Sequence, residues 1–190
     1  ATLISKAPLT PANKRRAVQT KTVPTAVYGN EWTRPSLDRC ARLRGMIMKC
    51  IWGSSSLLKC QEVVVAILND PTRVDLYFGG AYRSILDANR MLVKCEHRMH
   101  DFYQGLSDIR KGTTKFHVNG AINGFHKYCK ELGIRVILTK EHGTEKVYIV
   151  TPLGARIDLC TPHVTHLSAS IRDTCRYAAL EHLRARVGLK

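Results

Sequence analysis

The spacing of apolar residues differs in one stretch of this 190-residue chain, and that difference constrains the fold more than any other feature. Up to about residue 132 and again after residue 168, apolar side chains recur every three or four positions, the period of a helix with one buried side. Between these parts, two β-branched runs at 134–139 and 145–151 flank His142–Gly143, as the strands of a hairpin do. The predicted fold class is therefore mainly α with a small β-hairpin (α+β), a helical half followed by a helix–hairpin–helix half.

Capping and breaking residues set the limits of the predicted helices. Serine and asparagine accept hydrogen bonds from the first free amides of a helix, and glycine closes its last turn. The expected N-caps are Ser36, Asn119 and either Ser168 or Ser170, and the expected closing glycines are Gly53 and Gly133. These signals place helices at 36–53, 56–69, 73–95 with an interruption at Gly79–Gly80, 97–110, 120–132 and 168–187.

The same patterns predict three domains. Residues 1–35 are interrupted by Pro8, Pro11 and Pro24 and are expected to form a basic extended arm. A helical domain over 36–112 and an α+β C-terminal domain over 113–190 follow. No run of 18 apolar residues occurs, which excludes a membrane-spanning helix.

The charge of the chain indicates a polyanionic partner. The sequence has 30 Lys and Arg against 15 Asp and Glu, a formal charge of +15. Such an excess repels itself, and RNA, DNA or an anionic membrane surface would relieve the repulsion. Nucleic acid is favoured, RNA first, because the basic residues are spread over several elements and not gathered beside one amphipathic anchor. A basic surface that serves only solubility is the alternative.

The residues expected to meet nucleic acid are cations of the arm and of the first and last helices, with one aromatic side chain that could stack on a base. They are Lys14, Arg15, Arg16, Lys21, Trp32, Arg39, Arg42, Arg44, Arg172, Arg176, Arg184 and Arg186. Reversing Arg39, Arg42 and Arg44 to Glu is expected to weaken RNA binding without loss of helix.

The first 30 residues do not decide the cellular compartment of the protein. They contain five Lys and Arg and no acid, which suits a mitochondrial transit peptide and equally an RNA-binding arm. The seven cysteines are odd in number and widely spaced, and Cys40, Cys129 and Cys175 occupy apolar helix positions. These features predict a reducing intracellular compartment without disulfides, mitochondrial or nuclear.

Two Cys/His clusters invite a zinc interpretation. They are Cys95, His97 and His100, and Cys160, His163 and His166. Each offers three ligands where zinc needs four, so the fourth would come from His126, Cys129 or the other cluster. Neither has a paired Cys-x-x-Cys, and surface histidines explain both clusters as well. The prediction is no metal and no cofactor.

Residues 14–53, KRRAVQTKTVPTAVYGNEWTRPSLDRCARLRGMIMKCIWG, resemble the junction between palm and thumb in the reverse transcriptases of non-LTR retrotransposons. In that family a Leu/Val-Pro-x-Ala-x-Tyr-Gly block leads into an Arg- and Leu-rich helix. Here the block is Val23, Pro24, Ala26, Tyr28 and Gly29. The stretch from Trp52 through EVVVAILNDPTRVDLYFGGAYRSILDANRML, and the segments 120–125 and 132–134, are similar to the region that follows the polymerase core.

The resemblance implies a thumb-like domain over 36–112 that grips a template–primer duplex. Two-metal polymerisation needs clustered carboxylates, which that family supplies partly as an adjacent Asp-Asp pair, and this chain has no such pair. The predicted function is accordingly a retrotransposon-derived, non-catalytic nucleic-acid-binding protein that grips the backbone of RNA or of an RNA–DNA duplex. It would belong to a larger ribonucleoprotein, such as a mitochondrial ribosome. The alternatives are the thumb fragment of an active reverse transcriptase and a structural subunit of a protein assembly.

Overall fold

The computed structural model describes residues 2–28, 35–53, 65, 70–112 and 120–188. The chain is mostly helical with a small three-stranded antiparallel sheet, so the predicted fold class is confirmed. The predicted helix over 56–69 lies outside the described residues except for Val65, and so do the expected cap Asn119 and Trp32.

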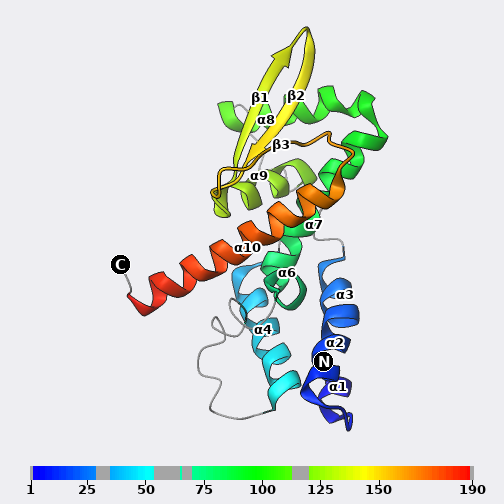
Figure 1. The fold of residues 1–190 in the computed structure, drawn as a ribbon, viewed down its shortest axis with the longest axis vertical. Helices are drawn as coiled ribbons and strands as arrows, with labels where there is room; N and C mark the ends of the chain where they lie inside the picture. Colours follow the sequence, from blue (N-terminus) through cyan, green and yellow to red (C-terminus); the bar gives the residue numbers. More distant parts are fainter. Residues whose placement is uncertain (1, 29–34, 54–64, 66–69, 113–119, 189–190) are drawn as a thin grey trace. The chain divides into compact units, whose positions relative to one another are not determined.

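The chain divides into two compact units (Figure 1). The first comprises 1–28, 35–80 and 175–190, and the second comprises 29–34 and 81–174. The helices of the first unit are α1 (Thr2–Lys6), α2 (Pro11–Ala17), the π-helix η1 (Val18–Thr22), α3 (Val23–Val27), α4 (Leu37–Trp52) and α6 (Pro71–Val74). The second unit holds η3 (Glu96–Arg98), α8 (Met99–Lys111), α9 (Ala121–Glu131), β1 (Arg135–Glu141), β2 (Thr144–Val150) and β3 (Arg156–Asp158). The division falls within α7 (Leu76–Lys94) and within α10 (Val164–Val187). It differs from the predicted domains 1–35, 36–112 and 113–190, because the first unit takes residues from both ends of the chain.

The N-terminal segment is helical and not extended, which corrects the prediction of an extended arm. Pro11 is the first residue of α2, where its missing amide costs nothing, and the Thr10 hydroxyl accepts a hydrogen bond from the Asn13 amide at 3.4 Å. Pro24 has no amide hydrogen to donate to an α-helical hydrogen bond, and the residues just before it form the π-helix η1. Val18 and Val23 are buried. The prolines therefore start or reshape helices here, and burial of these valines offsets the cost.

Helix α4 has the predicted limits. The Ser36 hydroxyl accepts a hydrogen bond from the Arg39 amide at 3.3 Å, and Gly53 ends the helix with a φ of 82°. Glycine adopts such a positive φ without the steric cost that other residues bear. Cys40, Ile47 and Ile51 are buried along one side. Both caps were predicted correctly because they depend on local backbone chemistry.

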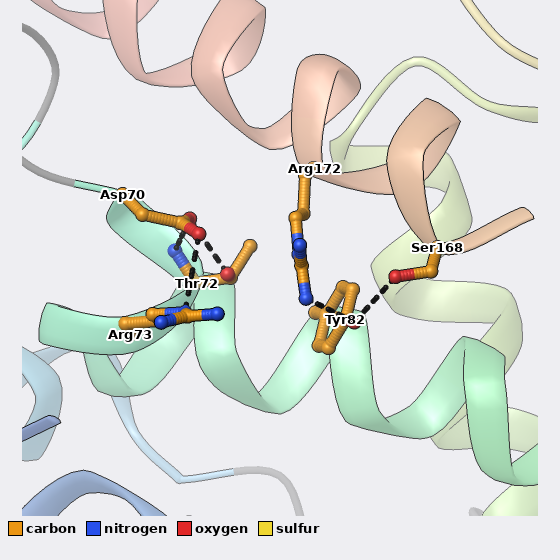
Figure 2. A network of polar contacts seen from close by, with 6 residues as sticks. All are labelled: Asp70, Thr72, Arg73, Tyr82, Ser168 and Arg172. Atoms are coloured by element: carbon orange, nitrogen blue, oxygen red, sulfur yellow. Dashed lines mark hydrogen bonds and ion pairs between the residues drawn. The ribbon is translucent and has the colours of Figure 1, made fainter. Parts of the chain in front are cut away.

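The predicted interruption at Gly79–Gly80 is wrong, because α7 runs through both glycines without a break. The break falls at Asp75, between α6 and α7. The Asp75 carboxylate accepts hydrogen bonds from the amides of Tyr77 at 2.8 Å and Phe78 at 3.4 Å. Figure 2 shows the corresponding cap of α6, in which Asp70 accepts from the amide and the hydroxyl of Thr72. Capping aspartates, and not the glycines, divide this region.

The second unit is built around the predicted hairpin. β1 and β2 pair antiparallel from Arg135↔Val150 to Glu141↔Thr144, and they appear as paired arrows in Figure 1. His142 and Gly143 both have a positive φ, 50° and 81°, as a two-residue hairpin turn requires. β3 pairs with the end of β2 and was not predicted, because a strand of three residues is too short to show alternation.

Helices α8 and α9 pack against each other and against the sheet to form the core of the second unit. The rings of Phe102 and Phe125 meet edge to face at 5.4 Å, and Tyr128 and Ile149 are buried. The final helix begins at Val164, four residues before the predicted start, so Ser168 and Ser170 lie inside it and do not cap it. The Ser168 hydroxyl instead hydrogen-bonds the Tyr82 hydroxyl at 2.7 Å.

Candidate functional site

The basic residues of the N-terminal helices are mostly exposed. Arg15 and Arg16 lie on α2, Lys21 lies on η1, and Arg39 and Arg42 lie on α4. α1 and α2 both pack against α4, so these cations lie on one packed group of helices in the first unit. The predicted residue Lys14 is half-buried, and its ammonium group donates a hydrogen bond to the Ser5 carbonyl at 2.8 Å.

These helices carry almost no acid. Within 2–28 and 35–53, nine Lys and Arg stand against the single acid Asp38. Arg44 is in an ion pair, and the other eight have no ion pair with any residue that the structure describes. We call these eight the N-terminal cations: Lys6, Lys14, Arg15, Arg16, Lys21, Arg39, Arg42 and Lys49. Seven of them are exposed, so their charges can meet an external anion, whereas Lys14 is half-buried and its ammonium group already donates to the Ser5 carbonyl.

Arg44 does not belong to this set, which corrects its prediction as a phosphate contact. Its Nε donates to a carboxylate oxygen of Asp75, which is fully buried. The same carboxylate accepts the amides at the start of α7. Arg44 neutralises a buried charge and joins α4 to α7, so it is committed to the fold.

The four predicted arginines of α10 divide between the two units. Arg172 belongs to the second unit, and Figure 2 shows it beside Tyr82 and Ser168. Its guanidinium lies 5.4 Å from the centroid of the Tyr82 ring and donates to the Tyr82 hydroxyl at 3.2 Å. Arg172 is thus half-buried against an aromatic ring and is not fully exposed as expected, and its role as a phosphate contact stays a prediction.

The other three arginines of α10 belong to the first unit. Arg176 is exposed, and Arg184 donates to the Glu181 carboxylate at 2.7 Å. This exposed pair within one helix costs little to break. The side chain of Arg186 lies outside the described part of the structure.

The Cys/His clusters do not assemble into a metal centre among the described residues, where no group of three or more His, Cys, Asp or Glu could hold an ion. His97, His163 and His166 are exposed, and His100 contacts Glu145 at 3.1 Å. Cys95 and Cys160 are half-buried. Burial, followed by the charges of Asp158 and Glu96, raises the pKa of the Cys160 thiol to about 11.

A basic cavity in the second unit was not predicted from the sequence. Its volume is about 490 Å³, and three cations line it: Arg110 from the end of α8, Lys130 from the end of α9 and Arg135 from the start of β1. His126 and Cys129 also line it. These residues come from three elements, and their only shared signal in the sequence is that each cation stands next to a predicted element boundary.

The structure has no helix of sufficient length and apolar character to cross a membrane within its described residues. This agrees with the expectation from the sequence.

Comparison of the chain with protein-family models, with curated proteins and with solved structures gives no match. The resemblance to the thumb region of non-LTR reverse transcriptases therefore stays a prediction.

Proposed function

We propose that this chain is a non-catalytic nucleic-acid-binding protein that holds the sugar–phosphate backbone, RNA in the first place, through its N-terminal cations. The observation that carries the proposal is the lack of compensation: eight cations on α1, α2, η1 and α4 have no ion pair with any described residue. Unpaired cations on packed helices repel one another, and phosphates would remove that repulsion. Binding of this kind positions the chain on a backbone and carries no sequence information.

A nucleic acid fits these cations better than a membrane does. Helix α1 has five residues, too few for an amphipathic helix that lies in a lipid interface. The cations extend over four helical segments, as contacts with successive phosphates require. A larger ribonucleoprotein is the setting that we propose, because a protein that grips a backbone without chemistry needs other components to act on the RNA.

A salt titration tests the proposal. The intact chain, with no ligand added, is first measured for co-purified nucleic acid by its absorbance ratio at 260 and 280 nm. Binding to a fluorescein-labelled RNA hairpin, to the DNA hairpin of the same sequence and to phosphatidylserine vesicles is then followed by anisotropy and co-sedimentation. With six to eight phosphate contacts, affinity for RNA is expected to fall by about 10³-fold or more between 50 and 200 mM salt.

Two results would overturn the proposal. The first is RNA affinity that does not change across the titration. The second is tight binding to the anionic vesicles without binding to either hairpin, which would assign the cations to a lipid surface. If neither nucleic acid nor lipid binds, the structural-subunit alternative is favoured, and the search turns to acidic protein partners.

A further inference from the structure

The basic cavity of the second unit has the composition of an anion site. Arg110, Lys130 and Arg135 line it, and no acid is among its described lining residues. None of these three cations has an ion pair with a described residue, whereas Arg83, Arg98 and Lys146 of the same unit do. Three cations without an ion pair to a described residue therefore line one concave place of this unit.

The pKa of His126 depends on the charges that line this cavity. Burial lowers the pKa of its ring, and the positive charges of Lys130 and Arg110 lower it further. Asp108 and Glu131 are near Arg110 and Lys130 in sequence, but neither lines the cavity. The two charges that lower this pKa thus belong to residues that line the cavity.

Helix capping does not account for these cations. α9 ends in a Schellman motif: the Ile134 amide donates to the Cys129 carbonyl at 2.8 Å, and the Gly133 amide donates to the Lys130 carbonyl at 3.2 Å. Gly133 has a φ of 69°, as that motif requires. α8 closes in a similar way at Gly112, with a φ of 66°. The backbone itself caps both helix ends, so the Arg110 and Lys130 side chains remain available.

The remaining lining is apolar or backbone. Ile134 is buried, Val136 and Ile137 are half-buried, and all three line the cavity. A volume of about 490 Å³ lies within the range of small-ligand pockets and exceeds what a single inorganic anion would fill. The occupant should therefore combine an anionic group with a flat or apolar part.

We infer that this cavity binds a phosphate-bearing ligand of the size of one nucleotide, with its phosphate at Arg110, Lys130 and Arg135 and its apolar part along the lining segment 134–137. The phosphate can belong to a free nucleotide or to one unit of a nucleic-acid strand. The site is separate from the N-terminal cations and does not depend on their proposed function.

The experiment uses the full chain with three probes: inorganic phosphate, AMP, and a short oligonucleotide with and without a 5′-phosphate. Binding is measured by calorimetry and by the NMR shifts of the His126 ring. The test variant is Lys130→Ala. The matched control is Lys127→Ala, an exposed lysine of the same helix that does not line the cavity. Circular dichroism compares the folding of both variants, and Lys130→Gln replaces Lys130→Ala if the latter is not folded.

The intact chain is expected to bind AMP with a Kd of about 1 mM or tighter. Lys130→Ala should weaken binding by about tenfold or more, because a hydrogen bond to a charged group is lost, and Lys127→Ala should not. A bound phosphate should also raise the pKa of His126, because it offsets the cations beside the ring. A preference for the 5′-phosphorylated oligonucleotide over AMP assigns the phosphate to a strand, and the opposite preference assigns it to a free nucleotide.

Absence of binding by all three probes overturns the inference, and so does an equal loss in Lys127→Ala and Lys130→Ala, which would show a diffuse field without a site. Loss of RNA binding through the N-terminal cations would leave AMP binding unchanged, so the two proposals fail independently.

Discussion

The two units hold the same number of cations and differ in how those cations are compensated. Each contains 15 Lys and Arg, but the first contains 5 acids and the second contains 10. In the second unit Asp87 contacts both Arg83 and Arg90, Glu145 contacts Lys140, and Glu141 contacts Lys146. Other cations contact aromatic rings: the Arg156 guanidinium lies 4.4 Å from the centroid of the Tyr148 ring. Net charge alone therefore does not identify a binding surface.

In the first unit three acids form ion pairs with described residues. Asp75 pairs with Arg44, Asp70 with Arg73, and Glu181 with Arg184. None of these pairs involves α1, α2 or η1, which contain no acid at all. Two nearby arginines of one helix can therefore differ in environment: Arg44 pairs with a buried carboxylate, and Arg42 is exposed.

The first prediction concerns stability, where Arg44 and Arg42 should differ most. Arg44→Ala leaves the buried Asp75 carboxylate without its ion-pair partner and should lower the free energy of unfolding by about 3–5 kcal/mol. Arg42→Ala removes an exposed side chain and should change it by less than about 0.5 kcal/mol. Urea unfolding followed by circular dichroism measures both. Equal stability of the two variants would contradict a structural role for Arg44. A large loss of stability in Arg44→Ala would also explain why reversing Arg39, Arg42 and Arg44 together is a poor test of RNA binding.

The next effect compares the two units directly. Arg15, Arg16, Arg39 and Arg42 are changed together to Gln, and the matched control changes Arg83, Arg90, Arg98 and Lys140, which are paired cations of the second unit. Both variants lose the same net charge. The first should lower RNA affinity by about 10²–10³-fold and reduce the salt slope by about 1 for each lost contact. The control should bind nearly as the unchanged chain does. Similar losses in both would show that total charge, and not its location, drives binding.

A smaller effect concerns Cys160, which lies near acids of the second unit. Its pKa of about 11, against an ordinary 9.0, should reduce its thiolate fraction at pH 8 by about 100-fold. Alkylation by iodoacetamide, measured by mass spectrometry over pH, should therefore show a midpoint near 11. Asp158→Asn should lower this midpoint, because it removes a negative charge beside the thiol. Asparagine keeps the shape of the side chain, whose oxygen accepts a hydrogen bond from the Cys160 amide. An ordinary midpoint in the unchanged chain would contradict the assigned environment.

The smallest effect is at the exposed hairpin. The hydrogen bond from Lys146, more than any other contact, lowers the pKa of Glu141. A carboxyl group with a lowered pKa stabilises the fold above its ordinary value of 4.5, and this contribution is lost as the pH falls through the folded-state pKa. Lys146→Ala should raise the Glu141 pKa toward 4.5 in a carbon-detected NMR titration. Lys140→Ala, which removes the partner of Glu145 on the same hairpin, should leave it nearly unchanged.

Sequence patterns predicted the local features of the fold well and the long-range ones poorly. Ser36 acts through its hydroxyl on the adjacent helix turn, and Gly53, Gly133 and the turn at His142–Gly143 act through their own backbone, so their roles are visible in the residue types. The helical state of 2–27 was missed because it depends on the burial of Val18 and Val23. The continuity of α7 through Gly79 and Gly80 was missed for a related reason, since both glycines are buried and burial outweighs their low helix propensity.

Residue types and their spacing are enough to predict that the chain is mainly helical with one hairpin, and that it carries a large excess of cations with almost no acid near its start. Helical period, capping and charge are properties of neighbouring residues, so they need no tertiary contact to be seen. Only the tertiary structure decided which cations are available. It buried Asp75 against Arg44, stacked Arg172 on Tyr82, and brought Arg110, Lys130 and Arg135 from three elements to one cavity. An ion pair or a cavity depends on which distant residues the fold places side by side, and no local pattern encodes that choice.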